Sequence, residues 1–258
     1  MKYFIALIIT TILCTCAQAE IRSTTVEYKH GSAVLEGYLT YDDSIQGKRP
    51  GVLVVHEWWG LTPLTKKHAD DIARLGYVAF AVDMYGKGVT TADPKKAGEL
   101  SGAYRSDRKL MFSRAMAGLD VLRNHPLVVP EKLAAIGYCF GGTTVLELAR
   151  GHAPVAGIVS FHGGLDTPDP AATKDVKSRV LVLHGADDTF VTWDQIKTFM
   201  DEMRRSGADW QMVFYSGAVH SFTNPEADSY GIKGIAYNKK ADMRSWQAMR
   251  AFLDELFK

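Results

Sequence analysis

The chain has 258 residues, of which 47% are hydrophobic and 23% charged, and its formal net charge is +1 at pH 7. This composition supports one large hydrophobic core, and neither a repeat nor a Pro/Gly/Ser-rich linker divides the chain. The near-neutral charge argues against nucleic acid and anionic membrane surfaces as partners, because both attract strongly basic proteins.

The N-terminus has the features of a secretory signal peptide. An apolar stretch follows Lys2, and Ala17-Gln18-Ala19 provides a small-x-small cleavage site. The stretch is too short to act as a stable membrane anchor. We therefore expect cleavage near Ala19 to remove residues 1–19, so that residues 20–258 form a single domain in the periplasm or outside the cell. Lipidation of Cys16 is the alternative interpretation.

Cysteine usage agrees with a specific role for one thiol. Two of the three cysteines, Cys14 and Cys16, lie in the predicted signal peptide, which leaves Cys139 alone in the mature chain. An intrachain disulfide is then impossible. A single thiol in an exported protein is open to oxidation, and this favours a functional use for Cys139.

Apolar runs recur along the chain and predict about eight strands, separated in the later part by segments with helical periodicity. This alternation predicts an α/β fold, with a mostly parallel sheet covered by helices on both faces. The predicted strands are Thr24–Tyr28, Val34–Thr40, Gly51–Val55, Tyr77–Val82, Leu133–Ile136, Val155–Ser160, Arg179–Leu183 and Trp210–Tyr215.

Two further segments complete the predicted architecture. Trp246, Met249, Leu253 and Leu256 recur at helical spacing and indicate a C-terminal helix packed on the core. The segment from Tyr85 to Arg105 is rich in Gly, Thr, Lys and Ala, and we expect a loop and a short helix there. Because loops at the carboxyl ends of parallel strands build the pocket in such sheets, this segment is expected to set substrate selectivity.

A tight turn between a strand and a helix presents Cys139. Gly137-Tyr138-Cys139-Phe140-Gly141-Gly142 follows the strand ending at Ile136 and precedes the buried helical run Thr143–Ala149. Glycines on both sides of the thiol allow strand and helix to approach closely, as in the nucleophile elbow of hydrolases. A buried cysteine that serves only as a small hydrophobic residue is the alternative interpretation.

An acid and a histidine follow Cys139 in the order that such an elbow requires. Asp188 comes after the strand ending at Leu183, and His220 comes after the strand ending at Tyr215. A histidine base activates the thiol, and a carboxylate fixes the tautomer of that histidine. Cys139, Asp188 and His220 are therefore the predicted catalytic triad, and Asp187 is the competing acid.

Four motifs together resemble the dienelactone hydrolases, also called carboxymethylenebutenolidases, of the α/β-hydrolase superfamily. They occur in family order and span most of the mature chain. The resemblance implies an α/β-hydrolase fold, an ester or lactone substrate and no cofactor. The motifs are His56-Glu57-Trp58-Trp59-Gly60, Gly137-Tyr138-Cys139-Phe140-Gly141-Gly142, Asp188-Thr189-Phe190-Val191 and His220-Ser221-Phe222.

The same resemblance implies roles for residues around the thiol. Glu57 is expected to contact the resting thiol of Cys139, where its like charge disfavours the thiolate until substrate arrives. The backbone N–H groups of Trp58 and Phe140 are expected to form the oxyanion hole. A surface loop residue or a cap on a helix near Thr62 is the alternative interpretation of Glu57.

The resemblance also implies substrate-binding positions at Tyr85, Lys87 and Asn224. Family members that act on dienelactone hold its carboxylate with two arginines, which correspond here to Lys87 and Asn224. Lysine lacks the planar fork of arginine, and asparagine carries no charge. Selectivity for dienelactone itself is therefore not expected. Arg105 is a candidate replacement from another loop, although arginines of this kind are commonly solvated.

The same residues are compatible with functions other than ester hydrolysis. A metal site would need several of His56, Glu57, His162, His184 and His220 to converge, but none of them has close ligand spacing, so no metal is expected. A thioesterase or peptidase would use the same triad, and a non-catalytic redox or binding protein would need only the thiol. The ordered triad favours a cysteine-dependent hydrolase of small-molecule esters or lactones that acts through a thioester intermediate.

Overall fold

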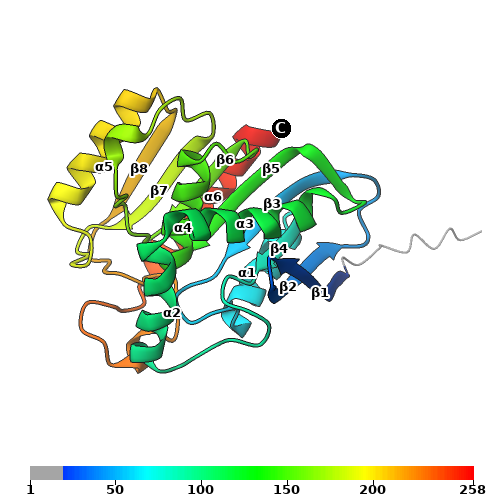
Figure 1. Cartoon of the computed structure of the whole chain (residues 1–258), viewed down its shortest axis with the longest axis horizontal. Helices are drawn as coiled ribbons and strands as arrows, with labels where there is room; N and C mark the ends of the chain where they lie inside the picture. Colours follow the sequence, from blue (N-terminus) through cyan, green and yellow to red (C-terminus); the bar gives the residue numbers. More distant parts are fainter. Residues whose placement is uncertain (1–19) are drawn as a thin grey trace, which may run out of the picture.

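The computed structural model describes residues 20–258, and the predicted signal peptide, with its cleavage site and Cys16, lies outside the described residues. In this described part of the chain, one sheet of eight strands forms the centre, in the order β1-β2-β4-β3-β5-β6-β7-β8 (Figure 1). The strands are β1 (Ile21–His30), β2 (Ala33–Asp42), β3 (Arg49–Val55), β4 (Val78–Val82), β5 (Val128–Tyr138), β6 (Gly157–Phe161), β7 (Arg179–Gly185) and β8 (Trp210–Tyr215).

The sheet is mostly parallel, which confirms the fold predicted from the sequence. Strands β3 to β8 pair in parallel, whereas β1 pairs antiparallel with β2, and β2 pairs antiparallel with β4. All eight predicted strands are present. The largest difference is β5, which begins at Val128 rather than Leu133 because its first residues continue along the edge of Arg49 in β3.

Helices cover both faces of this sheet (Figure 1). Alternate residues along β3 point to opposite faces of the sheet. Leu53 and Val55 belong to the hydrophobic cluster that includes α3, α4 and α5, whereas Val52 and Val54 belong to the cluster that includes α1 and α6. The helices are α1 (Pro63–Ala73), α2 (Pro94–Ser106), α3 (Arg108–Arg123), α4 (Phe140–Arg150), α5 (Trp193–Ser206) and α6 (Lys239–Phe257), with short 3₁₀ turns η1 (Pro170–Ala172) and η2 (Ala227–Tyr230).

The segment from Tyr85 to Arg105 contains the expected loop and helix, but the helix is longer than expected. Asp93 accepts a hydrogen bond from Lys95 N and starts α2, which continues to Ser106. Asp107 then accepts one from Leu110 N and starts α3 immediately. None of the helices within residues 20–258 is long and apolar enough to cross a membrane.

Candidate active site

Cys139 lies at the turn between β5 and α4, in a backbone conformation that side chains rarely adopt. Its φ and ψ are 53° and −112°, and such strain costs about 1–3 kcal/mol and persists only where the surroundings enforce it. Glycines make the turn possible. A Cβ on Gly137 would overlap the carbonyl oxygen of Gly141, and a Cβ on Gly141 would overlap that of Val55.

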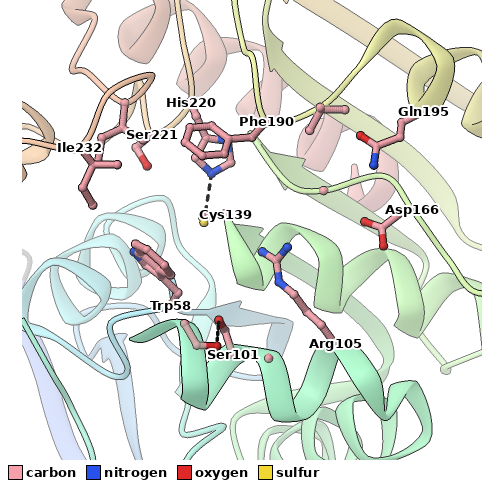
Figure 2. Close-up of a pocket in the computed structure, with 15 residues that line it drawn as sticks. Trp58, Ser101, Arg105, Cys139, Asp166, Phe190, Gln195, His220, Ser221 and Ile232 are labelled. Atoms are coloured by element: carbon pink, nitrogen blue, oxygen red, sulfur yellow. Dashed lines mark hydrogen bonds between the residues drawn. The ribbon is translucent and has the colours of Figure 1, made fainter. Parts of the chain in front are cut away.

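The structure brings Cys139, His220 and Asp188 together from three separate segments. His220 Nε2 lies 3.1 Å from Cys139 Sγ, and His220 Nδ1 lies 2.8 Å from Asp188 Oδ2 (Figure 2 shows the first of these contacts). The other carboxylate oxygen of Asp188 accepts a hydrogen bond of 2.8 Å from Phe190 N. The base therefore faces the sulfur with one nitrogen and an oriented carboxylate with the other.

Asp187, the competing acid, does not take part in this chain of contacts. It is exposed, and its N–H donates a hydrogen bond to Ala218 O. The side chain of Asp188 has no exposed area. The geometry therefore places Asp188, and not its neighbour, beside His220.

Electrostatics in this group favour a charged imidazolium. Burial alone would lower the pKa of His220, but the negative charge on Cys139 and the hydrogen bonds with Asp188 and Cys139 outweigh it and raise the pKa to about 10. The sulfur also lies at the N-terminal end of α4, where the helix dipole favours negative charge. A charged imidazolium and the N-terminal end of a helix are both surroundings that stabilise a negative charge on a nearby atom.

The two residues whose amides are predicted to form the oxyanion hole are near Cys139, since Trp58 lines the same cavity and Phe140 follows Cys139 in the chain. Trp58 follows β3, and Phe140 is the first residue of α4. Neither amide has a hydrogen-bond partner in residues 20–258, so both are free to bind the oxygen of a reacting carbonyl group. Tyr85 donates its hydroxyl hydrogen to Trp58 O at 3.1 Å and thereby holds the loop that carries the first amide. Tyr85 is thus placed behind the Trp58 backbone, outside the residues that line the cavity.

Glu57 is buried next to this site, but the structure does not bring its carboxylate into contact with Cys139. Its Oε2 accepts a hydrogen bond of 2.7 Å from Asn224 Nδ2, while Oε1 has no partner in the described part of the chain. Burial raises the pKa of Glu57 to about 7, against the opposing effects of Asn224 and His220. The expected contact is absent because Asn224 holds the carboxylate and His220 occupies the sulfur.

A cavity of about 450 Å³ opens onto the sulfur. Its walls come from α2, from the loops after β3, β6 and β7, from the first turn of α5, and from the segment that starts at His220. Its lining residues are Trp58, Gly98, Ser101, Gly102, Arg105, Cys139, Gly164, Asp166, Phe190, Val191, Gln195, His220, Ser221, Ile232 and Ile235.

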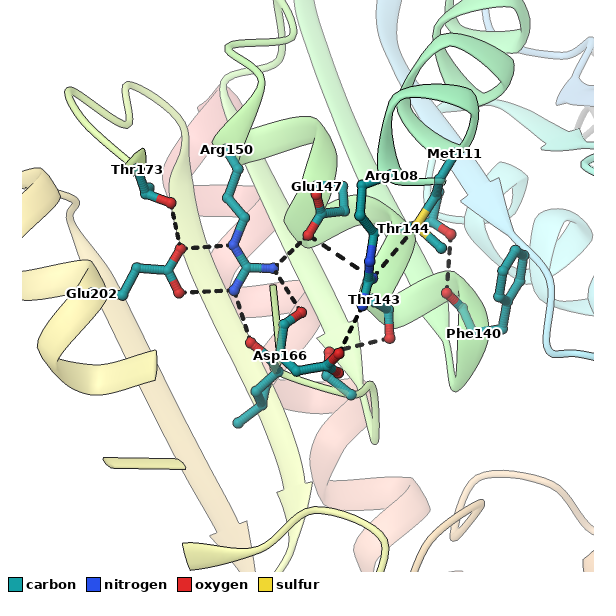
Figure 3. A network of polar contacts seen from close by, with 12 residues as sticks. Arg108, Met111, Phe140, Thr143, Thr144, Glu147, Arg150, Asp166, Thr173 and Glu202 are labelled. Atoms are coloured by element: carbon teal, nitrogen blue, oxygen red, sulfur yellow. Dashed lines mark hydrogen bonds and ion pairs between the residues drawn. The ribbon is translucent and has the colours of Figure 1, made fainter. Parts of the chain in front are cut away.

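A network of buried charges fixes one wall of this cavity (Figure 3). Arg150 on α4 donates to Leu165 O at 2.8 Å and to both carboxylate oxygens of Glu202 on α5. Thr143 donates its hydroxyl hydrogen to Gly164 O at 3.1 Å. Helix α4, which begins directly after Cys139, is therefore tied to the loop that lines the cavity.

None of the three predicted substrate-binding residues lines the cavity, and Lys87 and Asn224, like Tyr85, make contacts elsewhere. Lys87 Nζ lies 2.7 Å from Glu27 Oε2 and 3.4 Å from Glu36 Oε2, so carboxylates on β1 and β2 hold it at the surface and away from the cavity. Asn224 is buried against Glu57 and does not line the cavity either. Arg105, the candidate replacement for the missing arginines, does line it.

Two histidines of the alternative metal site, His56 and His162, make other polar contacts. His162 Nε2 lies 2.7 Å from Thr223 Oγ1, and His56 Nε2 accepts a hydrogen bond from Met84 N at 3.3 Å. Residues 20–258 contain no group of three or more His, Cys, Asp or Glu side chains that could hold a metal ion.

Several cavity residues had no signal in the sequence. Ile232 and Ile235 belong to a segment without periodicity, and Gln195 is one polar residue among many on α5. Gly98 and Gly102 had a usable signal, since two glycines four residues apart are unusual inside a helix. That spacing would have indicated a face of α2 that carries no side chains at these two positions.

The parallel sheet, the strained elbow and the ordered thiol, imidazole and carboxylate define an α/β hydrolase. The sequence model that describes the Dienelactone hydrolase family matches residues 35–257 of this chain. The chain therefore belongs to that family. The site is therefore that of a dienelactone hydrolase-like hydrolase, which acts on a small-molecule substrate.

Relatives of known structure and sequence agree with this assignment. A dienelactone hydrolase-like promiscuous phosphotriesterase from metagenomic libraries is 42% identical, with a TM-score of 0.89 over 93% of this chain and 100% of that one. The carboxymethylenebutenolidase homolog of Mus musculus is 25% identical over 194 residues, which are 74% of this chain and 76% of that protein. An α/β hydrolase from a deep-sea metagenome of the Medee basin shares the fold at 16% identity, with a TM-score of 0.67 over 91% of this chain and 98% of that one.

Proposed function

We propose that the protein is a cysteine-dependent hydrolase of carboxylic esters or lactones. In the first half-reaction the sulfur of Cys139 attacks the carbonyl carbon, and the carbonyl oxygen becomes an oxyanion bound by the amides of Trp58 and Phe140. The carbon–oxygen bond to the alcohol then breaks. His220 gives its proton to the departing alkoxide, while Asp188 stabilises the imidazolium until that transfer.

The second half-reaction hydrolyses the thioester. His220, now neutral, takes a proton from water, and the resulting hydroxide attacks the thioester carbonyl in the same oxyanion site. The carbon–sulfur bond breaks and releases the carboxylic acid. The Cys139 sulfur leaves as a thiolate next to imidazolium, which restores the starting charges.

One observation carries this proposal, namely the alignment of Cys139 Sγ, His220 and Asp188 at 3.1 and 2.8 Å. The sulfur opens onto a cavity of about 450 Å³, which accommodates a small-molecule ester. A purely structural cysteine needs neither an oriented histidine nor two free amides beside it.

Replacing Cys139 with alanine tests the proposal. Hydrolysis of an aryl ester such as 4-nitrophenyl acetate should fall by on the order of 10⁴-fold or more, as for loss of other triad nucleophiles. The fold should remain, since a methyl group in place of a small thiol leaves little cavity. Circular dichroism and thermal melting check the fold, and rapid acid quench followed by peptide mass spectrometry should find the acyl group on Cys139 in the unmodified protein. Full activity in the alanine variant would disprove the assignment.

Phosphotriester hydrolysis is a second candidate activity. The relative that is 42% identical over 93% of this chain is described as a promiscuous phosphotriesterase. The thiolate and the two amides have the right chemistry to attack a phosphoryl centre and to bind its oxygen. Turnover of a phosphotriester such as paraoxon, lost again in Cys139→Ala, would support this activity.

We also propose that the protein is exported and loses residues 1–19. The basic start, the apolar stretch and the site ending at Ala19 support this. Expression of the full chain in a bacterium, followed by fractionation and intact-mass measurement, should give a protein that begins near Glu20 in the periplasm or medium. A full-length cytoplasmic product would contradict the proposal.

A further inference from the structure

Phe161, the last residue of β6, and His162, which follows it, connect the nucleophile to the strand that leads to the acid. Cys139 N donates a hydrogen bond of 3.0 Å to Phe161 O, and His162 N donates one of 2.8 Å to Leu183 O in β7. The φ of His162 is 41°, a conformation that side chains rarely adopt and that persists only where the surroundings enforce it. The end of β6 is thus held on two sides, and this fixes the direction of the His162 side chain.

The side chain of His162 reaches the segment that carries the base. Its Nε2 lies 2.7 Å from Thr223 Oγ1, and its ring packs edge-to-face against those of His220 and Phe222, with centroids 5.3 and 5.1 Å apart. Ser221 has a φ of 57°, so this segment also holds a conformation that its surroundings must enforce. His162 therefore contacts both the base and the part of the chain that orients the base.

Packing alone does not explain a histidine at this position. The side chain of His162 is wholly buried, and its Nδ1 has no hydrogen-bond partner in the described part of the chain. A buried polar atom without a partner destabilises a fold, and an apolar side chain would avoid this penalty. What the imidazole adds is its hydrogen bond with Thr223, which is buried as well.

The surroundings of His162 also keep its imidazole uncharged. Burial and the positive charge of His220 lower the pKa of His162 well below its usual range, and His184 on β7 and His68 on α1 act in the same direction. The ring of Tyr138 on β5 lies near it too, with centroids 6.2 Å apart. At neutral pH His162 therefore adds no positive charge that would oppose an imidazolium on His220.

We propose that His162 is a positioning residue, which acts through Thr223 to hold His220 against the sulfur of the nucleophile. The neutral imidazole fixes the Thr223 hydroxyl, and the three residues before Thr223 lead directly back to the base. Without this hydrogen bond the segment relaxes, and an imidazolium on His220 then stabilises negative charge on the sulfur less well. The inference rests on the proposed triad, but it concerns the resting site, whose geometry is measurable without an ester.

Labelling of Cys139 with iodoacetamide across a range of pH, followed by peptide mass spectrometry, tests the inference. Thr223→Val removes the hydroxyl and nearly preserves the shape of the side chain. Its profile of labelling rate against pH should move to higher pH by about 0.5–1 unit, and kcat for 4-nitrophenyl acetate should fall by about 3- to 10-fold, as for loss of one hydrogen bond. Thr223→Ser, which keeps the hydroxyl, should recover most of both effects.

A second variant at the other end of the contact sharpens this test. His162→Phe keeps a ring but loses the hydrogen bond, so it should move the labelling profile in the same direction. The double variant His162→Phe/Thr223→Val should move it no further than the larger single effect, because both changes remove one contact.

Thr40→Val is the matched control, because it makes the same change at a buried threonine of β2, whose Oγ1 donates to Asp70 Oδ1 at 2.9 Å. It should lower the melting temperature and leave the labelling profile and kcat unchanged. A wild-type labelling profile in Thr223→Val that is folded by circular dichroism, or an equal shift in Thr40→Val, would overturn the inference. If the wild type hydrolyses no ester while Thr223→Val still shifts the profile, the proposed function fails and the positioning role stands.

Discussion

Replacing Glu57 with glutamine should make stability less dependent on pH, because the carboxyl group is buried in a setting that disfavours its charge. Only 6% of Glu57 is exposed, and burial raises its pKa to about 7 from the ordinary value of 4.5. At about 1.4 kcal/mol per pH unit, this difference corresponds to about 3 kcal/mol. Glutamine keeps an oxygen that can accept the hydrogen bond from Asn224 Nδ2, so the change removes mainly the charge.

The direction follows from proton binding. Between about pH 4.5 and 7 the folded protein retains a proton on Glu57 that the unfolded chain releases, so the wild type loses stability as pH rises through this window. Above about pH 7 the wild type has lost all of the stability that the Glu57 proton contributes. Glu57→Gln has no such group, and its free energy of unfolding should therefore exceed that of the wild type by a margin that grows by about 3 kcal/mol between pH 4.5 and pH 8.

Urea denaturation of both proteins across this pH range measures the margin. Glu131→Gln, which changes an exposed glutamate on β5, is the control and should follow the wild type at every pH. Parallel pH curves for Glu57→Gln and wild type would refute the reasoning, since they would mean that the folded protein does not penalise the charge.

Two further predictions concern the acid of the predicted triad and the face of α2 that lines the cavity. Asp188→Asn should lower kcat for an aryl ester by on the order of 10⁴-fold, as neutralisation of the triad acid does in serine enzymes. Asp187→Asn should change kcat by less than about threefold, because Asp187 is exposed. Steady-state kinetics measure both effects, and the reverse order would assign the acid role to Asp187. Gly102→Ala should raise the free energy of unfolding by about 0.5–1 kcal/mol. It should also lower the ratio of kcat/KM for a long-chain ester to kcat/KM for 4-nitrophenyl acetate. If this ratio does not change, the face of α2 that carries Gly102 does not contact the substrate.

Much of the fold was predictable because the strands are nearly continuous apolar runs. Val52 to Val55 and Val78 to Val82 are wholly buried on both faces, so their sequence carries the signal of a central parallel strand. The turn at Cys139 was equally predictable, since only glycine fits at Gly137 and Gly141. The length of α2 was harder to predict because Gly98 and Gly102 weaken its helical signal, and both lie at the cavity.

The substrate-binding residues were less predictable because they depend on side-chain partners that the sequence does not specify. The local motif placed a cation at Lys87, but Glu27 and Glu36 on neighbouring strands bind it at the surface. Arg105 lies on an exposed helix with no motif around it, and only the tertiary arrangement brings it to the cavity. Charge placement is a property of the folded surface, where the choice between two ion-pair partners depends on distances of a few ångströms.

The two buried carboxylates of the site illustrate how surroundings assign chemical roles to identical groups. Burial would raise the pKa of Asp188, but its hydrogen bond and charge interaction with His220 and the hydrogen bond from Phe190 N outweigh burial and lower it. Within residues 20–258 Glu57 has a hydrogen bond only from Asn224, so burial prevails and its pKa rises to about 7. At neutral pH Asp188 is therefore a fixed negative charge that orients His220, whereas Glu57 exchanges its proton readily. This separation supports the proposed role of His220, which lies 3.1 Å from Cys139 Sγ, as the base that acts on the thiol.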